Sequence, residues 1–94
     1  MIYVIASSIA RPLYLNDYRA SLLGLVAPTR KEPGCLLYDL HCNRDNPTHF
    51  IFYEIWDSQA ALDSHSESRH LTDHLERSKD WVASSELHLL KRIA

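Results

Sequence analysis

A chain of 94 residues with 46% hydrophobic and 23% charged residues has the size and composition of one globular domain rather than of a disordered segment. Its net charge is −2 and lysine and arginine form no cluster, so it offers no basic face to nucleic acid or to an anionic membrane. The opening stretch lacks the positive charge of a secretory signal, and no run approaches the ~20 apolar residues of a membrane-spanning helix, so we expect a cytoplasmic protein.

A strand and a helix are predicted for the first third of the chain. The apolar, β-branched run Ile2–Ile9 predicts the strand. Over residues 13–27, apolar side chains recur at spacings of three and four, which is typical of a helix with one buried face. Pro12 suits the entry to this helix, and we expect Pro28 to kink or end it.

A β-hairpin is predicted next. Cys35–Cys42 follows a polar connector that finishes in a turn signal at Gly34, and it predicts a second strand. Residues 43–47 are turn-forming and should lead into a third strand. Because Cys35 and Cys42 are seven residues apart, we expect them on opposite faces of the strand and predict two unpaired thiols.

The third strand, His49–Trp56, contains the most informative anomaly in the sequence. Successive side chains of a strand point to opposite faces, and here one face carries an aromatic row with a carboxylate in it: Phe50, Phe52, Glu54 and Trp56. The other row is also mostly apolar, which predicts a central strand covered on both faces. Burial among aromatic rings should raise the pKa of Glu54 unless a partner pairs with it.

Two helices and a strand complete the chain. Asp57 or Ser58 is a suitable N-cap for a helix over Gln59–His65. After a short break, Arg69–Val82 predicts a second helix, and its sparse apolar positions indicate that it lies half exposed. A pair of serines should end it, and Glu86–Ile93 alternates well enough to predict a fourth strand.

The element order β-α-β-β-α-α-β predicts an α+β fold. We expect a mostly antiparallel four-stranded sheet with helices on one face, close to a ferredoxin-like arrangement. The other face carries isoleucine and leucine on several strands, and the chain has no second helical layer to cover it. A second copy of the chain is the simplest cover, so we predict a homodimer of facing sheets.

Three residues are candidates for a functional role because of their residue type and predicted position alone. Glu54 is either a functional carboxylate or a structural one, tied to an arginine or to backbone amides across the dimer. Trp56 is either core or the wall of a pocket for a planar substrate. His65 is either a surface histidine or one that folds back over the same pocket, where it could exchange protons near neutral pH.

Other kinds of site lack their residue patterns. His70 and His74 are four residues apart and could share a helical face, but there is no HExxH and no third ligand at helical spacing, so we expect no metal. With Gly24 and Gly34 as the only glycines, no phosphate-binding loop or dinucleotide fingerprint can form. We therefore expect no motif-bound nicotinamide or flavin cofactor.

The stretches PTRKEPGCLLYDL, FYEIWDSQAALDSH and SRHL resemble the antibiotic biosynthesis monooxygenase domain, and in particular the bacterial quinol monooxygenases. The resemblance extends over nearly the whole chain, taken as one domain over residues 1–94, and is strongest from Glu32 to Leu75. It implies a dimeric α+β barrel of two ferredoxin-like sheets.

The resemblance also implies a pocket with named roles. Glu54 and His65 would be the catalytic residues, and one of them would serve as the base. Trp56 and, less strongly, Tyr38 would bind the substrate. The implied activity is a cofactor-independent monooxygenase that oxidises a quinol-like or polyphenolic aromatic compound with O2, the substrate itself acting as the reductant.

Three alternatives to this activity follow from the same resemblance. Haem-degrading members need an asparagine on the first strand and a ligating histidine where Leu75 stands here, so haem is not expected. Members that isomerise a small phosphorylated signalling sugar share the framework, although Trp56 favours an aromatic substrate. A non-catalytic, dimeric module that binds a small molecule is the third alternative.

Overall fold

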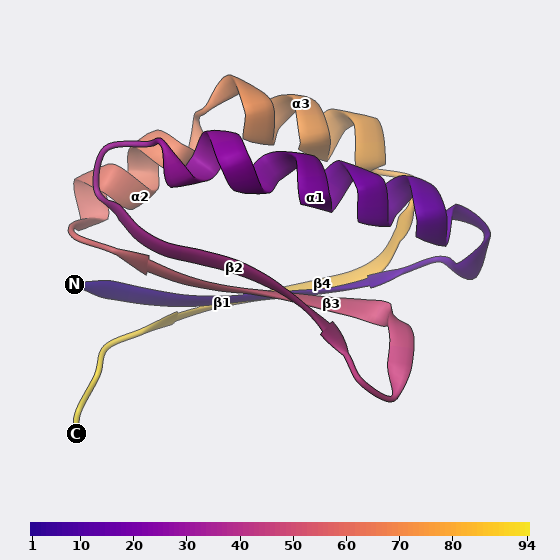
Figure 1. Cartoon of the computed structure of the whole chain (residues 1–94), viewed down its shortest axis with the longest axis horizontal. Helices are drawn as coiled ribbons and strands as arrows, with labels where there is room; N and C mark the ends of the chain where they lie inside the picture. The colour runs from indigo at the N-terminus through magenta and orange to yellow at the C-terminus, as the bar shows by residue number, and fades with distance from the viewer.

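The computed structural model describes the whole chain, residues 1–94 (Figure 1). The helices and strands follow one another in the predicted order, with one additional 3-10 turn. They are β1 (Ile2–Ala10), the 3-10 helix η1 (Pro12–Tyr14), α1 (Leu15–Arg30), β2 (Cys35–Asn43), β3 (Asn46–Trp56), α2 (Gln59–Ser66), α3 (Arg69–Ser78) and β4 (Val82–Leu90).

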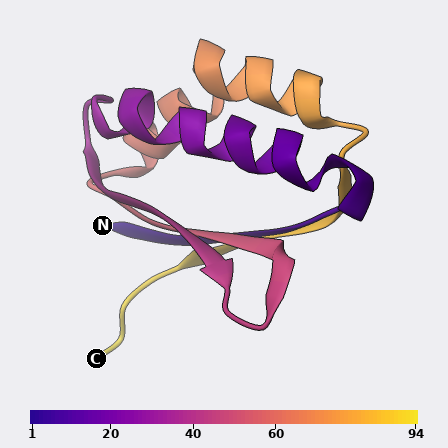
Figure 2. The same cartoon turned by 45° about the vertical axis from the view of Figure 1, so that its right-hand side comes forward.

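The four strands form one sheet in the order β2-β3-β1-β4, and every neighbouring pair is antiparallel. All three α-helices cover the same face of this sheet (Figures 1 and 2). The predicted α+β, ferredoxin-like fold with helices on one face is therefore confirmed. None of the helices is long and apolar enough to cross a membrane.

The core lies between the helices and the inner face of the sheet. The aromatic row of β3 points into it, with 0% to 6% of each side chain exposed: Phe50, Phe52, Glu54 and Trp56. Helix α1 contributes Tyr18, Leu22 and Leu25, spaced as the predicted helical face requires. The predicted burial of this β3 row is thus confirmed, including that of its carboxylate.

Pro28 does not end the first helix, which was one of its two predicted effects, because α1 continues to Arg30 with the proline inside it. The added residues are held by tertiary contacts that outweigh the loss of one backbone donor at proline. Thr29 is fully buried, and the Arg30 guanidinium donates to the backbone carbonyl of Tyr38 at 3.1 Å and to Asp39 at 3.0 Å.

The last helix and last strand are also displaced from their predicted positions. Helix α3 ends at Ser78 instead of Val82, and β4 begins at Val82 instead of Glu86. Antiparallel pairing decides this boundary, because Val82 pairs with Ala10 and the following serines continue the ladder along β1. Serines are tolerated there because β4 is an exposed edge strand.

A β-bulge changes the faces predicted for the second strand. Leu36 has no partner in the register between β2 and β3, so Cys35 pairs with Trp56 and Cys42 pairs with Phe50. Both cysteines are therefore on the helix-facing side and not on opposite faces. They are still free, as predicted, because seven residues of strand separate them by about 20 Å.

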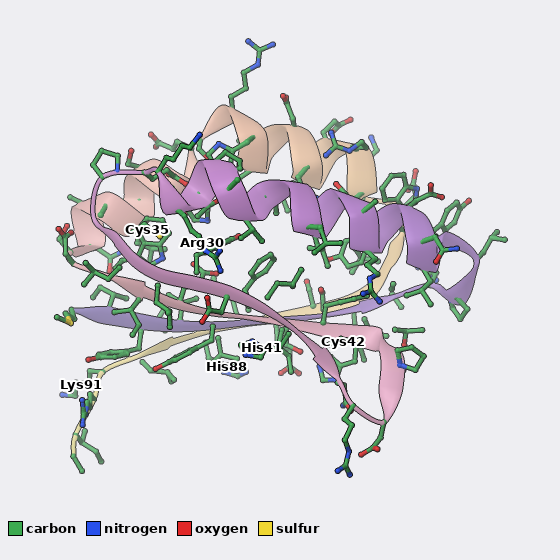
Figure 3. The ribbon with its side chains drawn as sticks, viewed as in Figure 1. Arg30, Cys35, His41, Cys42, His88 and Lys91 are labelled. Carbon is green, nitrogen blue, oxygen red and sulfur yellow. The ribbon has the colours of Figure 1, made fainter.

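The outer face of the sheet carries no helix. His41 of β2 and His88 of β4 project from this face (Figure 3). The two central strands place apolar and aromatic side chains between them, and these are only half-buried within the chain: Tyr3, Ile5, Ile51, Tyr53 and Ile55. This apolar, bare face is the one for which the sequence predicts a second copy as cover.

Gly34 determines where the connector between α1 and β2 lies. Its φ of 85° is in the left-handed region that glycine adopts readily. Its carbonyl accepts a hydrogen bond from the Asp57 amide at 2.9 Å, and a Cβ here would meet the Ala61 Cβ at 2.5 Å. The connector is thus held directly against the start of α2.

Replacing Gly34 with alanine should lower the free energy of unfolding by about 2 kcal/mol or more, because left-handed backbone costs an L-residue roughly 1–2 kcal/mol and overpacking adds to it. For a domain of this size, we expect a melting temperature about 10 °C lower. Gly24 is the matched control: a Cβ there meets nothing within 4 Å, so Gly24→Ala should stabilise the helix slightly. Equal melting temperatures for the two variants would contradict this account.

Candidate functional site

A cavity of about 500 Å³ lies between the sheet and the helices, within the usual range of small-molecule sites. Most of its lining is apolar, from Val4 of β1 to Leu62 of α2. Leu75 of α3 and Leu87 of β4 also line it and are more than half exposed, so the cavity opens between these two elements. Its polar lining comes from residues on strands and helices alike, including Ser8, Tyr18, Tyr38, Glu54, His65 and His74.

Glu54 faces this cavity from the middle of β3, between Val4 of β1 and Tyr38 of β2 in the register. Burial raises the pKa of its carboxyl group, while a hydrogen bond from Trp56 and the nearby His65 act in the opposite direction. The Trp56 indole N–H donates to Oε1 at 2.9 Å. Oε2 has no hydrogen-bond partner in the protein. Because every fully buried side-chain nitrogen or oxygen of the structure has a partner, Oε2 is not fully buried and is accessible from the cavity.

Trp56 lies in the core, one of the two alternatives for this residue, and not in the pocket wall that the resemblance implies. It is fully buried and is absent from the lining of the cavity, so its indole cannot form a wall against a substrate. Instead it packs on the imidazole of His65 with ring centroids 4.7 Å apart and holds one oxygen of Glu54. Trp56 therefore supports two cavity-lining groups from behind.

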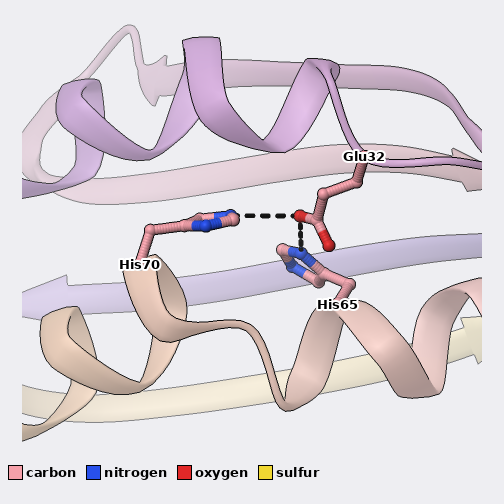
Figure 4. A group of neighbouring side chains, drawn as sticks. All are labelled: Glu32, His65 and His70. Carbon is pink, nitrogen blue, oxygen red and sulfur yellow. Dashed lines mark hydrogen bonds and ion pairs between the residues drawn. The ribbon is translucent and has the colours of Figure 1, made fainter.

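His65 lines the cavity from the last turn of α2. This short helix starts at Ser58, whose hydroxyl accepts from the Ala61 amide as an N-cap. The Nδ1 atom of His65 lies 2.7 Å from Oε2 of Glu32 (Figure 4). Because an ionised carboxylate only accepts, Nδ1 is the donor, and the neutral form of this imidazole has its lone pair on Nε2. Nε2 has no hydrogen-bond partner in the protein. It is therefore not fully buried either, and it is accessible from the cavity.

Tyr38 lines the cavity beside His65. Its ring stacks on Phe52 at 4.5 Å and meets the imidazole of His65 edge-on at 5.5 Å. Burial, and then the negative charge of Glu54, raise the pKa of the Tyr38 hydroxyl. The hydroxyl therefore stays protonated, and the residue brings a large apolar ring with one polar atom to the cavity.

A second polar group lies farther along the cavity. His74 of α3 is 3% exposed and lines the cavity beside Tyr18. Its Nδ1 is 2.7 Å from the Ser21 hydroxyl, which itself accepts from Arg77 at 2.8 Å. Ser21 has no other acceptor for its proton, so it donates to Nδ1, and the His74 proton is on Nε2.

His74 is a neutral hydrogen-bond donor at physiological pH. Burial, with the nearby Arg77 charge, lowers the pKa of His74 to about 4. Tyr18, which lies beside His74, donates a hydrogen bond to Ser8 of β1. Ser8 is the strand partner of Phe50, whereas the strand partner of Glu54 is Val4. Four residues along a strand separate these positions by about 13 Å, so His74 and Glu54 serve opposite ends of the cavity.

The structure brings Glu54, His65 and Tyr38 together on one cavity, and it adds Glu32, for which the sequence suggested no role. Glu32 is 33 positions from His65 in the chain, and its pairing depends on how the connector packs on α2. The signal available was its place in the EPG stretch. His70 and His74 do not act as a helical pair: His70 bonds to Glu32 at 3.0 Å, and His74 bonds to Ser21.

Known proteins share this fold and part of this sequence. The profile of the antibiotic biosynthesis monooxygenase family matches residues 1–77. PA3566 of Pseudomonas aeruginosa has a crystal structure that is 32% identical, with a TM-score of 0.95, covering 99% of this chain and 94% of that one. A crystal structure described as an antibiotic biosynthesis monooxygenase is also 32% identical, with a TM-score of 0.94 and full coverage of both chains.

Two further relatives are similar in sequence. Rv0793 of Mycobacterium tuberculosis, provisionally named a monooxygenase, is 37% identical over 71 residues, 76% of this chain and 69% of its own. The protein sll1783 of Synechocystis is 30% identical over 90 residues, which make up 94% of this chain but 61% of that relative. This chain thus spans less than two thirds of the Synechocystis protein.

Glu54→Gln should stabilise the fold at neutral pH but not in acid. The pKa of Glu54 is higher in the folded state than in the unfolded state. The protonated carboxyl group therefore contributes its full stability below the unfolded-state pKa, about 4.3. The free energy of unfolding of the wild type then falls as pH rises through the folded-state pKa. Glutamine keeps an acceptor for Trp56 without a charge. Urea unfolding of both proteins between pH 4 and 8 should show a stability difference that grows with pH; a constant difference would contradict a raised pKa.

Proposed function

The chain belongs to the antibiotic biosynthesis monooxygenase family, and from this premise we propose that it is a cofactor-independent monooxygenase that oxidises a quinol-like or polyphenolic substrate with O2. The observation that carries the proposal is the pairing of Glu32 with Nδ1 of His65, which leaves Nε2 as a base beside the Glu54 carboxylate in an apolar cavity.

The first step of the proposed reaction is removal of a phenolic proton. A phenol is a weak acid, and a neutral imidazole with its lone pair directed at the substrate is a suitable base near pH 7. Glu32 would stabilise the imidazolium that forms, because it accepts from Nδ1. Glu54 would accept a hydrogen bond from a substrate hydroxyl through Oε2 and favour the same charged imidazole. His65 is therefore the proposed base and Glu54 the proposed positioning group.

The two polar ends of the cavity favour an aromatic compound with oxygen atoms on opposite sides. His65 would take the proton of one hydroxyl, and Glu54 would accept a hydrogen bond from another hydroxyl of the substrate at the same end of the cavity. His74 would donate from Nε2 to the oxygen at the other side of the ring and hold the ring in position. The rings of Tyr38 and Phe52 and the aliphatic lining would contact the planar faces.

The chemistry balances without an added reductant. Deprotonation makes the substrate electron-rich, and one electron passes from the phenolate to O2 to give superoxide and a phenoxyl radical. These combine into a peroxide at a ring carbon, which takes the proton back from the His65 imidazolium and loses water. For a hydroquinone, one oxygen atom becomes a new ring substituent, the other leaves as water, and the ring ends as a hydroxyquinone.

The isomerase alternative has less support in the cavity. A phosphorylated sugar carries charge that proteins usually bind with arginine, lysine or a helix N-terminus. The residues that line the cavity include no lysine or arginine, and the lining is mostly apolar. A non-catalytic binding module is the outcome expected if no substrate turns over.

Purified, metal-stripped protein should consume O2 in the presence of at least one member of a hydroquinone and polyphenol panel. His65→Ala should lower kcat by about 100-fold or more, the usual loss of a general base, and Glu32→Gln should lower it less. Rates follow from an oxygen electrode, with ring hydroxylation confirmed by mass spectrometry using ¹⁸O2.

Leu23→Ala, on the exposed side of α1, is the matched control and should keep the full rate. Uptake no faster than autoxidation for every compound would overturn the proposed oxygenase. Turnover under anaerobic conditions would instead support an isomerase. Full activity of His65→Ala would show that the base is assigned to the wrong residue.

We further propose that the bare face of the sheet is covered by a second copy of the chain. The half-buried apolar side chains of the two central strands, such as Ile5 opposite Tyr53, would pack against their equivalents around a twofold axis. Tyr53 lies near the centre of this face. The helix-side cavity would then remain open in each copy.

The mass in solution, measured by sedimentation, should be twice the 10.9 kDa of one chain. Tyr53→Asp should yield monomers, because facing sheets would bury two carboxylates without partners. Leu23→Asp introduces the same charge on the outer surface of α1 and should leave the dimer intact. A monomeric wild type at micromolar concentration would contradict this assembly.

A further inference from the structure

We propose that Glu32, His65 and His70 form a binding site for a divalent transition-metal ion of the Zn²⁺ type, and that the ion inhibits the enzyme by reversing the proton arrangement of His65. The binding part of this inference stands on the three side chains alone. The inhibitory part rests on the proposed function, in which His65 is the base.

Three elements bring the donor atoms together. Glu32 comes from the connector after α1, His65 from the end of α2, and His70 from the first turn of α3. Figure 4 shows the Glu32 carboxylate between the two imidazoles. Oε2 lies 2.7 Å from Nδ1 of His65 and 3.0 Å from Nε2 of His70, and all three ligand atoms are within 4.8 Å of one another.

These separations are close to those of a metal centre. Tetrahedral zinc with bonds of about 2.0–2.1 Å places its ligand atoms about 3.3 Å apart. The two Glu32 contacts must therefore lengthen by about 0.6 and 0.3 Å. The two imidazole nitrogens, which lie within 4.8 Å of each other, must take the same spacing, and side-chain rotation can supply these changes. Two imidazoles and one carboxylate are also a donor set that zinc and similar ions bind in proteins, with water completing the shell.

The cluster is reachable from solvent on the side away from the cavity. The side chains of His70 and Glu32 are 26% and 14% exposed, and neither residue lines the cavity. Thr29 and Ser68 place hydroxyl oxygens 3.1 Å and 3.4 Å from Nε2 of His70, so the surroundings of the ion are polar. An ion can enter and carry a water ligand without passing the substrate.

Metal binding and base catalysis need opposite forms of His65. With Glu32 as the partner, Nδ1 carries the proton and Nε2 is free to accept one. A metal ion on Nδ1 displaces that proton, and the neutral imidazole then has its hydrogen on Nε2. His65 presents a donor to the cavity instead of a base, and Glu32 is occupied by the ion.

Untagged protein should bind one Zn²⁺ per chain in calorimetry, and Co²⁺ should give the visible absorption of a four-coordinate ion. His70→Gln keeps a donor for Glu32 but loses the imidazole, so its zinc affinity should fall at least tenfold. Its O2 uptake without metal should equal that of the wild type. Zinc should abolish O2 uptake by the wild type and reduce that of His70→Gln only at a concentration at least tenfold higher.

His88→Gln is the matched control, because His88 lies 3.2 Å from Glu86 on the exposed edge strand and should have no effect on zinc binding. Equal zinc affinity for His70→Gln and the wild type, or loss of binding in His88→Gln, would overturn the site. Binding at the site without any inhibition would overturn the switch. Calorimetry requires no substrate, so an enzyme inactive toward every phenol would refute the proposed function and leave the metal site standing.

Discussion

The hydrogen bond between Glu32 and His65 is the contact on which the site depends. At 2.7 Å it joins the connector after α1 to the end of α2, two segments whose own secondary structure does not bring them together. A hydrogen bond that involves a charged group contributes about 1.5–3 kcal/mol. It also determines which nitrogen of the imidazole is free. Gly34 makes the contact possible, because its backbone conformation lets the connector lie against α2.

Around this contact, the protein separates polar groups by an apolar cavity. Glu54 and His65 lie at one end and His74 lies at the other. Each of them has one polar atom bonded to a protein partner and one that is accessible. The partners, in the same order, are Trp56, Glu32 and Ser21. Electrostatic interactions are stronger in such a weakly hydrated space. Burial raises the pKa of Glu54 and lowers that of His74, so both groups favour their neutral forms more than in water.

Predictions for regular elements succeeded where the pattern of side chains decides the structure. The inward row of β3 is confirmed because alternation along a strand is a local property. Predictions failed at Pro28, Leu36 and the end of α3, where tertiary bonding or strand register overrides local preference. The roles of Trp56 and Glu32 were missed for a related reason: what a side chain touches across the fold is not encoded in its own neighbourhood.

By itself, the sequence determined the α+β fold, the order of its elements, the burial of Glu54 in an aromatic row and the family to which the chain is similar. These follow from periodicity and from short motifs, which are local. Only the tertiary structure decided that Trp56 is a buried support, that Glu32 orients His65, and that His70 and His74 serve different partners. Such facts depend on the packing of α2 and α3 against the connector and α1, where residues 33 to 53 positions apart meet.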